Sequence, residues 1–160
     1  MFFVDSTVFI KWVSARRILT LEEAVSGYVL FKISRGEEAL TTTLVKDEVL
    51  IWISRYRVSK IKDFMTNLRA LFSLNIVYPT LEDEWNAVHK IGKYPLGISD
   101  LINLSVMERL GIKDIVSLDK GFDSYPNVRR IFYELKREEG FRDFLEILHQ
   151  RNMRVEGLRL

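Results

Sequence analysis

Short apolar runs alternate with longer amphipathic stretches along most of the chain. The apolar runs are rich in β-branched and aromatic side chains, which is typical of buried strands. Neighbouring parallel strands need a long crossover connection, and the amphipathic stretches have the length to supply it as helices. We therefore predict an α/β fold, with a central, mainly parallel sheet of about four to five strands and helices on both faces. The predicted strands lie within residues 2–4, 39–45, 75–80, 114–119 and 129–135, and the predicted helices within residues 7–17, 20–34, 46–56, 59–74, 81–92 and 98–111.

The chain is predicted to form one domain. Its 160 residues fall in the usual single-domain range, and no stretch rich in proline or glycine divides it. Residues 1–133 form the main α/β unit, and residues 134–160 form a C-terminal helical extension of the same domain. The extension carries an apolar stripe that packs either on the chain's own body or on a partner, including a second copy of the chain. The stripe consists of Phe141, Phe144, Leu145 and Leu148.

The composition excludes several kinds of site. The chain has no cysteine, so disulfides and thiolate metal ligands are ruled out. Its net charge is only +2, so any contact with nucleic acid must come from local clusters of basic residues. The first residues lack the pattern of a signal peptide, and no stretch is apolar for the length of a membrane span. We expect a cytoplasmic protein with no membrane partner.

Two acidic residues follow predicted strands directly. Asp5 ends the run "FFV" and Asp119 ends the run "IVSL". In a parallel sheet the carboxyl ends of the strands lie at one edge, which is where such folds bind ligands. Asp114 enters its strand from the other end, so we interpret it as a solvated turn residue. The pattern therefore predicts that Asp5 and Asp119 meet at the functional edge of the sheet.

Glu48 and Asp100 are the other acids that the pattern singles out. Glu48 lies on the apolar face of its helix, where a carboxylate is costly unless it is neutralised. That face is outlined by Val45, Val49, Trp52, Ile53 and Tyr56. Asp100 follows the helix-cap candidate Ser99 at a predicted helix start, where it either only caps the helix or joins the other acids.

Four carboxylates at one sheet edge would repel one another and raise their pKa values unless a divalent cation lay among them. Oxygen ligands favour Mg²⁺ or Mn²⁺, and we interpret His89 and His149, on different helices, as incidental. Such a site suits hydrolysis of phosphodiester bonds in nucleic acid. Local clusters such as Lys11, Arg16 and Arg17 either bind the substrate backbone or form ordinary solvated surface.

With these residues in this order, the chain resembles the PIN-domain family, and most closely the small VapC-type ribonuclease toxins of prokaryotic toxin–antitoxin pairs. The resemblance covers about residues 1–133 and rests on "FFVDSTVFI" with Asp5, "LVKDEVLIWI" with Glu48, "GISDLINLSVMERLGI" with Asp100 and "IVSLDKGFDSYPNV" with Asp119. It implies a three-layer fold, a metal site built from these four acids, and Mg²⁺- or Mn²⁺-dependent cleavage of RNA. It also implies a homodimer and a small antitoxin partner.

Three positions qualify the resemblance. Thr7 stands where the family usually has Asn or Ser, and Ser117 stands where it often has Thr. Both hydroxyl groups are expected to support the metal site. Asp123 is an additional acid on the turn after Phe122, and it either ligates a second metal ion or only caps the turn.

Two other functions share parts of this pattern. A catalytically idle PIN-like scaffold would bind RNA or protein, but the presence of all four acids argues against a decayed site. A phosphotransferase of the haloacid-dehalogenase kind also begins with a strand-end acid, but its pattern needs a second Asp at the place of Thr7. The sequence therefore favours a metal-dependent endoribonuclease, the toxin of a type II toxin–antitoxin system.

Overall fold

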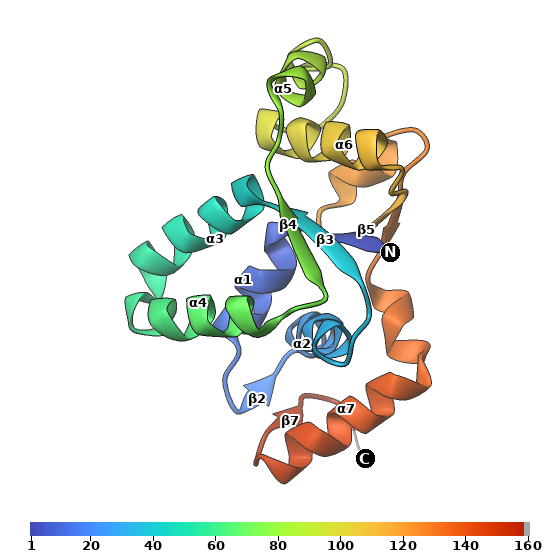
Figure 1. Cartoon of the computed structure of the whole chain (residues 1–160). Helices are drawn as coiled ribbons and strands as arrows, with labels where there is room; N and C mark the ends of the chain where they lie inside the picture. The colour runs from blue at the N-terminus through green and yellow to red at the C-terminus, as the bar shows by residue number, and fades with distance from the viewer. Residues whose placement is uncertain (159–160) are drawn as a thin grey trace.

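A five-stranded parallel sheet forms the centre of the computed structural model, which describes residues 1–158. The strand order is β4 (Leu74–Val77), β3 (Ala39–Thr42), β1 (Phe2–Val4), β5 (Asp114–Val116) and β6 (Arg129–Ile131). Helices lie around this sheet (Figure 1). The predicted α/β class, with a parallel sheet of this size, is confirmed.

The direction of the strand order reverses at β1. The chain crosses from β1 to β3 on one side, and later returns to pair β5 on the other side. In open parallel sheets such a change of direction opens a crevice at the carboxyl ends of the strands. Val4 of β1 pairs with Val116 of β5, and the amide of Asp5 donates to the Val116 carbonyl at 3.1 Å. The residues that follow these two strands are therefore neighbours.

Seven α-helices and three short 3-10 helices are found among residues 1–158. The α-helices are α1 (Ser6–Ser14), α2 (Leu21–Ser34), α3 (Thr43–Tyr56), α4 (Ile61–Ala70), α5 (Leu81–Val88), α6 (Ile98–Leu110) and α7 (Glu139–Gln150). The 3-10 helices are η1 (Val58–Lys60), η2 (Lys120–Ser124) and η3 (Tyr133–Arg137). In Figure 1, α5 and α6 lie together at the top, and α7 lies near α2 at the bottom. None of these helices is long and apolar enough to cross a membrane.

Two helix starts show how side chains set the boundaries. The sequence "TLEE" at Thr20 is a capping-box pattern, and the box forms at the start of α2: Thr20 Oγ1 accepts from the Glu23 amide, and the Thr20 amide donates to Glu23. Helix α3 begins at Thr43, three residues earlier than predicted, because Thr42 Oγ1 accepts from the Val45 amide at 3.2 Å. The cap overrides the β propensity of the threonines.

Other predicted boundaries are wrong. Helix α6 is capped by Gly97 rather than Ser99, so the predicted cap residue already lies inside the helix. Helix α4 stops at Ala70, four residues before the predicted end of the helix at residue 74, which leaves Phe72 outside the helix and 93% exposed. Tyr56, assigned to the buried face of α3, is 61% exposed at the helix end. Strand β6 stops at Ile131, and the chain then turns into η3.

The C-terminal segment packs back on the start of the chain. Helix α7 lies against α2, and the two-residue strand β7 (Arg154–Val155) pairs in parallel with β2 (Ile18–Leu19). The predicted extension reaches residue 160, and its last two residues lie outside the described part. Its apolar stripe meets aromatic rings of α1 and α2, with ring centroids of Phe144 and Trp12 6.0 Å apart and those of Phe144 and Phe31 5.3 Å apart.

Gly27 allows this close packing of α1, α2 and α7. A Cβ atom at this position would lie 2.4 Å from the Trp12 ring and 3.0 Å from the Phe144 ring. Carbon atoms in contact normally stay about 3.5–4.0 Å apart, so no larger residue fits without displacing Trp12. The glycine therefore marks the closest approach between the extension and the body of the domain.

Candidate metal centre

Asp5 lies at the carboxyl edge of the sheet and is only 3% exposed. It directly follows β1 and is the N-cap residue of α1. Its Oδ2 atom accepts from the Ser117 hydroxyl at 2.6 Å and from the Thr7 hydroxyl at 3.0 Å. Burial raises the pKa of the Asp5 carboxyl, while these two hydroxyl groups oppose the shift. One carboxylate oxygen is thus fixed in place by its neighbours.

The same two hydroxyl groups position the loop that carries Asp119. The Asp119 amide donates to Ser117 Oγ at 3.0 Å, and the Leu118 amide donates to Thr7 Oγ1 at 3.2 Å. Each hydroxyl therefore joins the Asp5 carboxylate to the backbone after β5. Thr7 and Ser117 therefore fix the Asp5 carboxylate relative to the loop of Asp119.

Asp100 shows that the four predicted acids share one electrostatic environment. It lies in the first turn of α6 and is partly buried. Burial is the largest cause that raises its pKa to about 6, followed by the charges of Asp5, Asp119 and Glu48. A hydrogen bond with the Gly97 backbone opposes the shift. Burial is thus the main cause of the raised pKa at both Asp5 and Asp100, and repulsion from neighbouring acids adds to it.

A buried hydrogen bond that the sequence analysis missed connects the helices of Glu48 and Asp100. Thr42, at the carboxyl end of β3, donates through Oγ1 to Asn103 Oδ1 on α6 at 2.6 Å. The same oxygen caps α3, which carries Glu48. Asn103 lies three residues after Asp100, so the two share a helix face. This spacing was the sequence signal that could have singled out Asn103.

The donor set suits a hard divalent cation. Across residues 1–158, no three acidic or histidine side chains are arranged to hold a metal ion as they stand. The other three carboxylates nevertheless act on the pKa of Asp100, and all four offer only oxygen, which Mg²⁺ and Mn²⁺ prefer. Binding an ion would require these side chains to turn toward one point.

The other acidic candidates lie in ion pairs. Both carboxylate oxygens of Asp123 accept from the Arg130 guanidinium at 3.0 Å, and this pairing lowers the pKa of Asp123. To ligate a second metal, Asp123 would have to leave Arg130. Asp114 binds Arg129 at the amino end of β5, at the edge of the sheet opposite to Asp5. Asp114 is therefore a half-buried, ion-paired residue at the start of a strand rather than the predicted solvated turn residue.

The basic cluster predicted for RNA binding lies away from the acids. Asp5 is the N-cap residue of α1, which has nine residues and is about 13 Å long. Lys11 lies in the second half of this helix, and Arg16 and Arg17 follow its end. Arg16 and Arg17 are exposed, and the Arg17 carbonyl accepts from the Arg154 amide in β7. The structure does not bring these residues to the carboxyl edge of the sheet.

A family model for the PIN domain matches residues 2–128. This match covers most of the chain and includes all four acids. The chain belongs to the PIN-domain family. No curated protein matches the sequence of this PIN domain.

Solved structures share the PIN fold at low sequence identity. The toxin VapC20 of Mycobacterium tuberculosis, described as cleaving the sarcin-ricin loop, is 15% identical, with a TM-score of 0.63 over 81% of this chain and 99% of its own. A toxin–antitoxin complex from Klebsiella pneumoniae is 18% identical, with a TM-score of 0.59 over 81% of this chain and 96% of that chain. VapBC2 from Rickettsia felis, bound to a promoter DNA fragment, is 12% identical, with the same TM-score and coverages.

Proposed function

We propose that this PIN domain is a metal-dependent endoribonuclease that hydrolyses phosphodiester bonds of RNA. The observation that carries the proposal is the shared electrostatic environment of Asp5, Glu48, Asp100 and Asp119 at the carboxyl ends of the strands. The charges of Asp5, Asp119 and Glu48 raise the pKa of Asp100, and a cation among these acids would offset that repulsion. The membership in a family that includes nucleases supports the same reaction class.

The chain's own residues would bind and orient the metal. Asp5, Glu48, Asp100 and Asp119 would hold a Mg²⁺ or Mn²⁺ ion. When bound, such an ion stabilises charge on the scissile phosphate and lowers the pKa of an attacking water. Ser117 and Thr7 hold Asp5 in one orientation, and Thr42 with Asn103 sets the helices of Glu48 and Asp100. Preorganisation of this kind reduces the cost of assembling the site.

The proposal extends to the biological setting. The structural neighbours are VapC toxins or complexes that contain a toxin and an antitoxin. We propose that this chain is the toxin of a type II pair, with a small antitoxin partner, and that it works in the cytoplasm as a homodimer. The fold similarity supports this assignment.

Removal of one acid tests the reaction. Replacing Asp5 or Asp100 by Asn should lower Mn²⁺-dependent cleavage of RNA by about 100-fold or more, because even partners of metal ligands contribute 10- to 100-fold. Cleavage is followed by gel electrophoresis of a labelled single-stranded RNA. The Asp114→Asn variant is the control, since it removes the same charge at the opposite sheet edge. Full activity in both the Asp5 and Asp100 variants would contradict the mechanism.

A further inference from the structure

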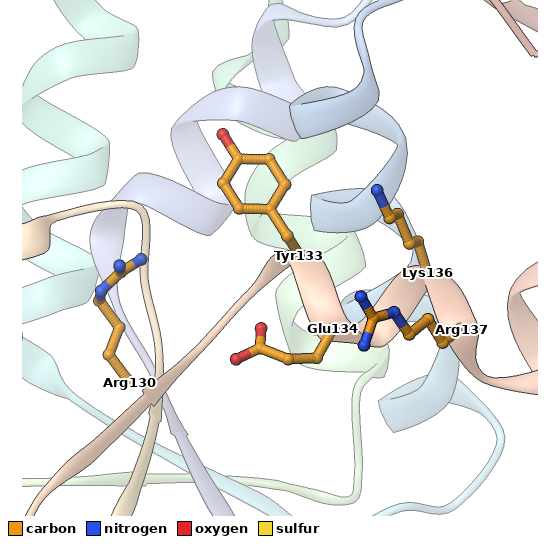
Figure 2. Close-up of a pocket in the computed structure, with 5 residues that line it drawn as sticks. All are labelled: Arg130, Tyr133, Glu134, Lys136 and Arg137. Atoms are coloured by element: carbon orange, nitrogen blue, oxygen red, sulfur yellow. The ribbon is translucent and has the colours of Figure 1, made fainter.

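An open pocket of about 250 Å³ lies between β6 and η3. It is lined by Arg130, Tyr133, Glu134, Lys136 and Arg137. Figure 2 shows Tyr133, Lys136 and Arg137 projecting from one short helix, with Arg130 across from them on the neighbouring strand. All five residues follow residue 128, where the match to the PIN family model ends. The pocket therefore belongs to the part of this chain that the family pattern does not explain.

The pocket has unused positive charge. Arg130 is already bound to Asp123 and to the Ser117 carbonyl, so its charge is paired within the protein. Lys136 and Arg137 are exposed, and neither forms a side-chain hydrogen bond or ion pair with any residue from 1 to 158. The acid in the lining, Glu134, accepts from the Phe132 amide at 2.9 Å. The two free cations can therefore bind an anion from solution.

An aromatic ring stands beside these cations in a fixed orientation. The Tyr133 hydroxyl donates to Glu22 on α2 at 3.0 Å, and its ring packs edge-to-face on Phe132 with centroids 5.2 Å apart. The residue remains 41% exposed. A held, accessible ring beside basic groups is the combination that binds single-stranded nucleic acid, in which a base stacks on the ring and a phosphate meets the cations.

The pocket lies next to the acidic centre. Helix η3 follows the carboxyl end of β6, the same edge of the parallel sheet that carries Asp5 and Asp119. Arg130 donates to the Ser117 carbonyl at 3.1 Å, and the hydroxyl of that serine binds Asp5. Ser117 thus connects Arg130, which lines the pocket, to Asp5 of the candidate metal centre. Arg130 therefore joins one wall of the pocket to the loop that leads to Asp119.

We propose that this pocket binds the backbone of single-stranded RNA beside the cleaved bond. Lys136 and Arg137 contact phosphate, and Tyr133 stacks on a base. This assignment rests on the proposed ribonuclease function and gives the C-terminal segment a role in holding the substrate. The pocket is a different surface from the one formed by Lys11, Arg16 and Arg17.

Two double variants test the pocket. Binding of a fluorescein-labelled oligouridylate is measured by fluorescence anisotropy, in EDTA and over a series of salt concentrations. Lys136→Ala with Arg137→Ala should weaken binding about tenfold and reduce the salt slope by about 1.4, or about 0.7 for each lost phosphate contact. Arg16→Ala with Arg17→Ala removes the same charge far from the acids and should leave both quantities nearly unchanged.

Tyr133 provides a second readout. Tyr133→Leu should weaken binding by about fivefold or more through lost stacking, whereas Tyr133→Phe keeps the ring and should bind like the parent. Equal effects of the two double variants, or no effect of Lys136→Ala with Arg137→Ala, would overturn the proposal. Because EDTA excludes cleavage, failure here would leave the metal mechanism standing. Failure of the cleavage test would likewise leave this binding result intact.

Discussion

Replacing Asp100 by Asn is expected to stabilise the metal-free protein at about pH 8, by about 1–2 kcal/mol. The pKa of Asp100 rises from 3.8 to about 6 in the folded chain, because the carboxyl is partly buried and faces three other acids. Each unit of such a shift corresponds to about 1.4 kcal/mol, which we reduce for partial exposure. The variant should therefore lose activity and gain stability.

The pH dependence follows from the direction of that shift. Between pH 3.8 and about 6 the folded protein binds this proton more tightly than the unfolded chain does. The free energy of unfolding of the parent should fall as pH rises through this window and stay reduced above it. The Asn variant has no such carboxyl, so the difference between the two proteins should vanish near the lower end of the window.

This result separates two interpretations of Asp100. An acid that only capped α6 would stabilise the helix, and its replacement would cost about 0.3–1 kcal/mol. Urea unfolding in EDTA measures directly whether Asp100→Asn raises or lowers the free energy of unfolding. Asp114→Asn is the control, because it removes the same charge. A variant less stable than the parent at about pH 8 would show that Asp100 is a capping acid and not part of a repelling cluster.

Replacing Phe144 by Ala is expected to destabilise the protein by about 3–5 kcal/mol. Phe144 is buried and packs on Trp12, Tyr28 and Phe31, which come from the first two helices. Small domains are stable by only about 5–15 kcal/mol, so this single change would remove a large part of the total. Thermal and urea unfolding measure the loss.

Phe72→Ala is the matched control, because Phe72 is 93% exposed and its truncation should change stability by no more than about 0.5 kcal/mol. If the two phenylalanine variants were equally stable, α7 would not pack on α2 as described. A large loss would show that the C-terminal segment is part of the folding unit and not an independent tail.

The elements with a strong local pattern could be predicted. Strand β1 is a continuous apolar run, and α2 has both a capping box and a glycine after its end, so local chemistry determines them. The pair of β2 and β7 could not be predicted, because each of these strands is only two residues long and carries no periodic signal. Their pairing depends on where α7 packs, which is a tertiary effect.

The candidate site could be predicted in part, because strand ends of a parallel sheet necessarily share an edge. This rule placed Asp5 beside the segment of Asp119, as the hydrogen bonds through Ser117 show. The bond between Thr42 and Asn103 joins residues distant in sequence, so no local pattern reveals it. The basic pocket escaped prediction for a similar reason, since 129–135 was expected to be one strand and its last residues instead turn into η3.

Titration of Mn²⁺ into the protein by calorimetry tests the central claim most directly. The parent and Asp114→Asn should bind Mn²⁺ with the same affinity, and Asp100→Asn should bind it about 100-fold more weakly or not measurably. A catalytically idle scaffold has no need for a metal at this edge. Absence of binding by the parent, or unchanged binding by Asp100→Asn, would contradict a metal centre built from these four acids.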